Sequence, residues 1–159
     1  MNKCLQRKSP FFFGLMLLLV YLSTGVQAAG NDVGQESQNR YMEGKRLYST
    51  GDFEKAIKVF TELTETSPDN SEYHHWLAKS YGRLAEQSSL LTAYKLSQKT
   101  RSELETAVAL DDSNVDALSD LKDYYTQAPV FLGGGDDKAA AIEKRLNELQ
   151  KNDQGPTSR

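Results

Sequence analysis

A step of 34 residues relates two similar helix starts in this chain of 159 residues. Gly44 aligns with Ala78, and Glu86 follows Ala78 at the same distance that separates Asp52 from Gly44. Internal similarity with a period of about 20 to 50 residues is typical of repeat proteins, in which each unit buries its apolar side against the next. The chain is therefore expected to fold as a row of stacked helix pairs.

The first repeat contains two stretches with the apolar spacing of a helix. Tyr41 and Gly44 lie on one side of a helix at 38–49, and Gly51 then turns the chain. The next helix ends before Pro68, and its apolar face consists of Phe53, Ala56, Ile57, Phe60 and Leu63. These two helices form the first expected pair.

The pattern recurs once more after a longer step. The run from His74 to Tyr81 reappears as the run from Leu118 to Tyr125, a step of 44 residues in place of 34. The additional residues fall in the segment 87–99, so the second repeat carries an insertion. Three repeats are therefore expected, at about 38–70, 71–114 and 115–150.

This pattern resembles three tetratricopeptide (TPR) repeats over residues 38–150, with Glu43 and Lys122 as departures from the usual residues. The resemblance implies an all-α fold, a short right-handed solenoid of three helix-turn-helix pairs. The segment from Ala128 to Ala139, with its Phe-Leu-Gly-Gly-Gly run, also resembles a subgroup of exported bacterial TPR proteins. That second resemblance implies architecture and export only.

In TPR proteins the first helices of successive pairs line a concave surface, where the resemblance places partner contacts. Carried over residue by residue, this concave face would contain Tyr41, Lys45, Tyr48, His75, Lys79, Arg83, Asp123 and Gln127. Its three cations form a basic strip that could hold the carboxylate of an acidic side chain or a chain terminus. A solvated helix face explains the same cations, and the spacing of the two tyrosines also fits the core.

The insertion offers a second candidate surface. It adds apolar side chains that the repeat does not require, namely Leu90, Leu91, Tyr94 and Leu96. If these side chains lengthen the helices and bury one another they belong to the core, and if they stay exposed together they mark a contact site. Further along, Phe131 and Leu132 are expected to pack the turn at 129–135 against the last helix pair.

A secretory signal peptide is expected at 1–28. Three basic residues precede an apolar run at 11–22, and Ala28 ends a small-residue cleavage site. A membrane-spanning helix needs about 20 apolar residues, so the run is too short for a retained anchor. We therefore expect a periplasmic or secreted protein with no stable membrane anchor after cleavage.

Two polar segments flank the expected repeats, a flexible leader at 29–37 and a disordered tail at 151–159. From residue 29 on, 16 basic side chains face 22 acidic ones, a net charge of −6. Nucleic acid binding uses a basic patch to neutralise phosphates. The acidic balance therefore argues against nucleic acid and anionic lipid as partners. The one cysteine, Cys4, lies in the expected signal peptide, so no disulfide is expected.

No catalytic, cofactor or metal site is expected. His74 and His75 are adjacent, whereas two metal ligands on one helix are usually four residues apart. The glycines at 133–135 lack the following Lys-Ser or Lys-Thr pair of a phosphate loop, and Asp136 and Asp137 would repel an anion there. Carboxylates distant in sequence could still meet in the fold.

Three functions follow in order of preference. The first is an exported binding module or scaffold that holds a protein or peptide on its concave face, with no catalysis of its own. The second is a structural module of the cell envelope that assembles with further copies of itself, because the last helix has no separate polar capping helix after it. The third is an enzyme whose carboxylates the sequence does not reveal.

Overall fold

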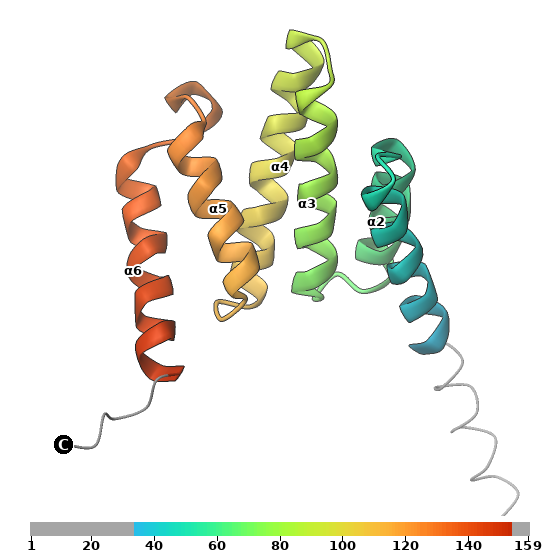
Figure 1. Cartoon of the computed structure of the whole chain (residues 1–159), viewed down its shortest axis with the longest axis horizontal. Helices are drawn as coiled ribbons and strands as arrows, with labels where there is room; N and C mark the ends of the chain where they lie inside the picture. The colour runs from blue at the N-terminus through green and yellow to red at the C-terminus, as the bar shows by residue number, and fades with distance from the viewer. Residues whose placement is uncertain (1–33, 154–159) are drawn as a thin grey trace, which may run out of the picture. The chain divides into compact units, whose positions relative to one another are not determined.

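The computed structural model describes residues 34–153, and over this range it contains helices and no strand (Figure 1). A first helix runs through residues 34–49. The later elements are α2 (Phe53–Thr66), α3 (Ser71–Glu86), α4 (Leu90–Leu110), α5 (Val115–Gln127), the short 3₁₀ helix η1 (Val130–Leu132) and α6 (Asp136–Asp153). The expected all-α fold is confirmed. The expected signal peptide, residues 29–33 of the leader and residues 154–159 of the tail lie outside the described residues.

The chain divides into two units, Met1–Asn39 and Arg40–Arg159, and the second contains α2 to α6 and the first helix from Arg40 on. Within that unit each helix packs against its neighbour in chain order: α2 on α3, α3 on α4, α4 on α5 and α5 on α6. Figure 1 shows α3 beside α4 and α5 beside α6 as antiparallel pairs. The expected second and third helix pairs are therefore present, and the first helix with α2 forms the first pair.

Side-chain caps and one glycine set the ends of these helices. The amide oxygen of Asn70 accepts from the backbone N–H of Tyr73 at the start of α3, and Asn114 accepts from Ala117 at the start of α5. Such caps satisfy backbone donors that have no partner inside the helix. Gly51 has a positive φ of 83°, which lets the chain leave the first helix and enter α2.

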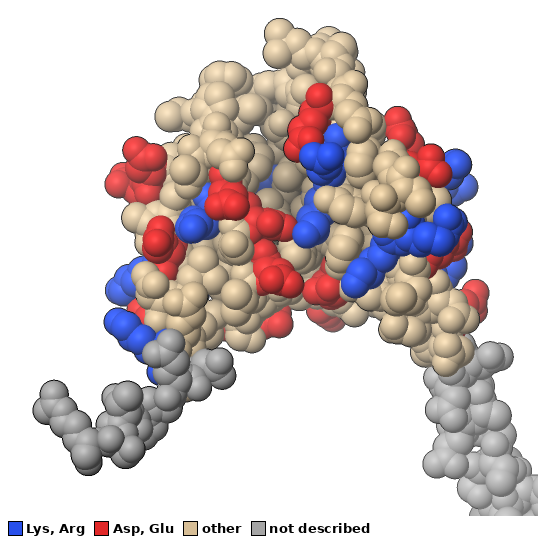
Figure 2. Space-filling view, in the orientation of Figure 1, with Lys and Arg blue, Asp and Glu red and all other residues tan. Residues whose placement is uncertain are grey.

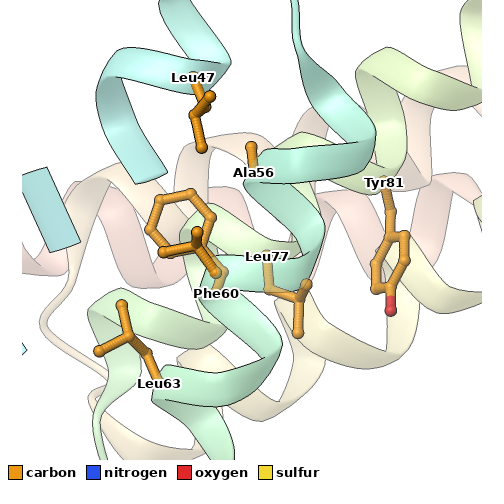
Figure 3. Close-up of a cluster of buried hydrophobic side chains, with 7 residues drawn as sticks. Leu47, Ala56, Phe60, Leu63, Leu77 and Tyr81 are labelled. Carbon is orange, nitrogen blue, oxygen red and sulfur yellow. The ribbon is translucent and has the colours of Figure 1, made fainter. Parts of the chain in front are cut away.

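The first core cluster joins the first helix, α2 and α3 (Figure 3). Its members are Leu47, Ala56, Val59, Phe60, Leu63, Leu77 and Tyr81. The ring of Phe60 is fully buried and lies 6.0 Å from the ring of Trp76, nearly parallel to it. A second cluster, made of Ala78, Leu104, Leu121 and Tyr125, continues the core through α4 and α5. The regular apolar spacing of the sequence therefore corresponds to burial between successive helices.

Three boundaries differ from those expected. The first helix already includes residues 34–37, which the sequence assigns to a flexible leader. Once a helix is nucleated, each added residue gains a hydrogen bond at little cost, so a polar segment can extend it without a core. The same reason explains why α6 continues to Asp153, into the expected tail. The insertion at 87–99 forms a tight turn and the start of the long helix α4, and so lengthens α4.

Two helical glycines provide a matched test of this packing. A Cβ atom on Gly44 would lie 2.7 Å from the Phe60 ring, which is buried and cannot move aside, whereas a Cβ on Gly82 would only touch Thr100 at 3.6 Å. We expect Gly44→Ala to lower the free energy of unfolding by about 1–3 kcal/mol. Gly82→Ala should raise it by about 0.5–1 kcal/mol, because alanine loses less entropy in a helix.

Urea unfolding of the two variants beside the wild type measures both changes. The packing around Phe60 is contradicted if Gly44→Ala stabilises the protein as much as Gly82→Ala does.

Candidate functional site

A groove of about 540 Å³ lies between α3, α4 and α5. The end of the first helix contributes Tyr48, and the segment after α5 closes the other side with Ala128, Pro129 and Leu132. Its remaining lining residues are Ala78, Lys79, Gly82, Arg83, Ala85, Glu86, Ser97, Thr100, Leu104, Asp120, Asp123, Tyr124 and Gln127. The groove thus combines an apolar floor with charged side chains, as binding clefts in proteins commonly do.

The structure brings together most of the residues expected on the concave face. Five of the eight line this groove: Tyr48, Lys79, Arg83, Asp123 and Gln127. His75 is only 2% exposed and lies beneath the surface. Tyr41 and Lys45 are not among the groove residues. Tyr41 packs against the first core cluster, and Lys45 Nζ lies over the Trp76 ring.

The expected basic strip faces acidic side chains. Lys79 Nζ lies 3.6 Å from Asp120 Oδ2, and Arg83 forms an ion pair with Glu86 on its own helix. In Figure 2 blue side chains lie over α3 and red ones over α5, with a hollow between them. Both basic side chains keep substantial exposure, 30% for Lys79 and 48% for Arg83. A ligand can therefore reach them from the groove.

Asp120 joins the groove to the buried histidine below it. His75 Nε2 donates a hydrogen bond of 2.7 Å to Asp120 Oδ2, while the buried Nδ1 atom of His75 has no hydrogen-bond partner among residues 34–153. Burial would raise the pKa of Asp120, but the hydrogen bond from His75 and the charge of Lys79 bring it below its ordinary value. Asp120 is therefore a carboxylate near neutral pH, and it fixes the positions of His75 and Lys79.

An aromatic and ionic cluster, made of Tyr41, Lys45, Glu72 and Trp76, adjoins the groove. Tyr41 Oη and Trp76 Nε1 both donate to Glu72 Oε1, at 2.7 and 2.9 Å. Burial would raise the pKa of Glu72, but these two hydrogen bonds bring it below its ordinary value. The Trp76 ring also lies 4.8 Å from Lys45 Nζ and 5.0 Å from Lys79 Nζ. Such cation–π contacts hold both ammonium groups toward one surface.

Glu72, Trp76 and Asp120 belong to this surface but were not predicted from the sequence as site residues. A signal for them exists, because the step of 44 residues that aligns His74 with Leu118 also aligns Trp76 with Asp120. Glu72 precedes Trp76 by one helical turn, so these two side chains face the same way. The repeat register thus aligns Trp76 with Asp120, and helical spacing adds Glu72.

Most of the second candidate surface is exposed, although Leu96 packs against the first core cluster. Leu90 is 89% exposed and Leu91 68% exposed, and Tyr94 is partly exposed as well. The expected packing of Phe131 on the last helix pair is wrong, since its ring stacks on Tyr94 of α4 at 6.4 Å. Because Leu90 and Leu91 are exposed, these two inserted side chains are not buried against their neighbours, and they remain candidates for a contact site.

Within residues 34–153, no group of three or more His, Cys, Asp or Glu side chains is placed to hold a metal ion. Over the same range, no helix combines the length and the apolar character needed to cross a membrane.

Comparisons with known proteins found a match to one family model and a similar solved structure. Residues 44–84 match the family model described as TPR repeat, a range that covers the end of the first helix, α2 and most of α3. A solved structure similar to the chain is the crystal structure of the Sgt2 TPR domain from Aspergillus fumigatus. It has 19% sequence identity and a TM-score of 0.47, over 78% of this chain and 85% of that chain. None of the curated proteins matches this chain.

Proposed function

We propose that this protein is an exported binding module, which holds a carboxylate-bearing segment of a protein or peptide in the groove between α3, α4 and α5. The TPR repeat match at 44–84 supports a role in protein interaction. The single observation that carries the proposal is that five residues expected on the concave face line one groove. The module needs no catalysis of its own, and the expected signal peptide supports a periplasmic or secreted location.

Lys79 and Arg83 are the groove's attachment points for a carboxylate. Arg83 is paired with Glu86 across an exposed surface, where such pairs contribute about 0–1 kcal/mol. A ligand carboxylate can therefore displace Glu86 at small cost and accept two parallel hydrogen bonds from the guanidinium. Lys79, which lies 3.6 Å from Asp120, adds a second positive charge on the same helix face.

The rest of the groove suits an apolar side chain beside that carboxylate. Ala78, Ala85 and Leu104 offer small or apolar surface, and Pro129 and Leu132 form the opposite wall. Asp120 and Asp123 lie on the α5 side, so a ligand with a second carboxylate near that wall would be repelled. The favoured ligand therefore has one carboxylate next to an apolar residue, as at the end of a peptide chain.

A peptide library with free carboxyl ends, compared with the same library amidated, tests this proposal. We expect the chain from residue 29 on to select peptides from the free library only. Arg83→Glu and Lys79→Glu should each weaken binding of the selected peptides by about tenfold or more, because each variant places a like charge at the ligand carboxylate. Lys58→Glu on α2 makes the same change of charge at an exposed position outside the groove.

Equal binding of free and amidated peptides would contradict the carboxylate site. If Lys58→Glu weakens peptide binding as much as Arg83→Glu does, the effect comes from the net charge of the protein. That result would also contradict binding in the groove.

Self-assembly is a second candidate, because the last helix is incompletely covered. Leu146 and Leu149 of α6 are only half-buried, and no further helix follows α6 among the described residues. An open apolar edge of this kind can take up a second copy of the chain. Sedimentation velocity over a wide concentration range separates the candidates, since a monomer at every concentration contradicts self-assembly.

A further inference from the structure

Exposed apolar side chains gather at one end of the helix pairs. Eight large apolar residues are exposed among the described ones, and five of them come from the start of α4 or from η1. We call this set the apolar tip: Leu90, Leu91, Tyr94, Val130 and Phe131. Val130 is 82% exposed and Phe131 72% exposed. A contiguous patch of this kind marks a contact surface, whereas scattered apolar residues do not.

The two halves of the apolar tip are held together by contacts. The rings of Tyr94 and Phe131 stack at 6.4 Å, which joins α4 to η1. Below them, Arg101 Nη1 and Tyr124 Oη both donate to the carbonyl oxygen of Leu132, at 3.3 and 3.0 Å. Because α4 and α5 both bind this carbonyl, η1 is fixed in place and keeps its apolar side chains turned outward.

The charge around the apolar tip differs from that of the whole chain. Between Glu86 and Glu103 the sequence contains Lys95, Lys99 and Arg101 and no acidic residue. Between Asp123 and Asp136 it contains no charged residue at all. Acidic side chains flank these two segments, since Glu86 ends α3 and Asp136 and Asp137 begin α6. The two segments that carry the apolar tip therefore contain basic residues and no acidic ones, although the domain as a whole is acidic.

The basic residues also follow the apolar ones in a regular order. Lys95 comes four residues after Leu91 and Lys99 four residues after Lys95, so they continue one stripe of α4. At a rise of about 1.5 Å per residue, the first lysine lies about 6 Å behind Leu91 along the helix axis. Both lysines are exposed, and Lys99 Nζ also lies 4.9 Å from the ring of Tyr81.

We propose that the apolar tip docks onto an anionic lipid surface, with its apolar side chains in the headgroup region and Lys95 and Lys99 at the lipid phosphates. Residues that bind a membrane interface without spanning it combine apolar and aromatic side chains with lysines, and insert about 5–10 Å. Lys95, about 6 Å behind Leu91 along the helix axis, lies within that depth, and Lys99 follows about 12 Å behind Leu91. The negative net charge of the domain argues against binding to anionic lipid. However, salt screens charges over about 10 Å, so the charges nearest the lipid determine whether it is attracted or repelled.

Vesicle co-sedimentation tests this docking directly. The chain from residue 29 on is used, because the apolar run at 11–22 would itself bind lipid and the described helices begin after it. We expect it to bind vesicles of phosphatidylcholine with phosphatidylglycerol and to leave pure phosphatidylcholine vesicles unbound. The triple variant Leu90→Ser, Leu91→Ser, Phe131→Ser should lower the partition coefficient by about tenfold or more. Lys95→Glu should lower it by a few-fold, as should high salt.

A matched control changes apolar residues that are exposed elsewhere. Met42→Ser with Leu110→Ser should leave the partition coefficient unchanged, since neither residue belongs to the apolar tip. Circular dichroism melting shows that each variant is folded. Absence of binding to the anionic vesicles overturns the proposal, as does equal binding by the triple variant. Concentration-dependent dimers that the triple variant abolishes, without lipid binding, would assign the tip to a second copy and would also overturn it.

Discussion

Replacing Phe60 by alanine is expected to lower the free energy of unfolding by about 3–5 kcal/mol. The Phe60 side chain is fully buried, and its ring packs on Tyr41 and Trp76 at 6.3 and 6.0 Å. Figure 3 shows it among the side chains of the first core cluster, so its removal leaves a cavity in that core. Since small domains are stable by about 5–15 kcal/mol, this single change removes a large part of the total.

Urea unfolding measures the change, and Phe131→Ala is the matched control. Phe131 is the same residue type, but it is 72% exposed, so its removal should change the free energy of unfolding by about 0.5 kcal/mol or less. Equal effects of the two variants would contradict the core described for the first helix pair.

The second large effect is expected at Gly134, in the turn between η1 and α6. A Cβ atom there would lie 1.8 Å from the carbonyl oxygen of Ala128 and 2.6 Å from its carbonyl carbon. These are backbone atoms, so no side-chain rotation relieves the overlap. We expect Gly134→Ala to lower the free energy of unfolding by about 3 kcal/mol, at the upper end of the range for overpacked sites.

The same variant should also weaken the groove. Ala128, Pro129 and Leu132 form one wall of it, and this wall moves if the turn must open. Hydrogen exchange of the α6 amides measures the opening, and peptide binding measures its consequence. Gly34→Ala is the control, because a Cβ at Gly34 meets no atom within 4 Å. A Gly134→Ala variant with wild-type exchange in α6 would contradict the close approach of the two backbones.

The sequence predicts the helices well because each one is encoded locally. The apolar spacing of α2, the caps at Asn70 and Asn114 and the glycine at Gly51 are signals within a few residues of the element that they define. The turn at 129–135 is different. Its glycines suggest a flexible link, yet Gly134 is buried, and Arg101, distant in sequence, holds the turn through the Leu132 carbonyl. The contact between Arg101 and Leu132 joins residues that are 31 apart in sequence, so no short sequence pattern near the turn predicts it.

For the candidate site, too, one part could be predicted from the sequence and another could not. The repeat register places Lys79, Arg83, Asp123 and Gln127 together, because first helices of successive repeats lie side by side. It gives no warning that Lys79 faces Asp120, or that Lys45 turns toward the Trp76 ring. Those contacts depend on how far each side chain extends across a helix interface. The spacing of the repeats gives no information about that distance.

The central claim is that the groove between α3, α4 and α5 binds a peptide carboxylate. The most direct test is a nuclear magnetic resonance titration of the isotope-labelled chain with a peptide from the free-carboxyl library and with its amidated form. We expect chemical-shift changes at Lys79, Arg83, Asp123 and Gln127 with the free peptide, and much smaller changes with the amide. Shifts confined to residues outside the groove, or the same shifts with both peptides, would contradict it.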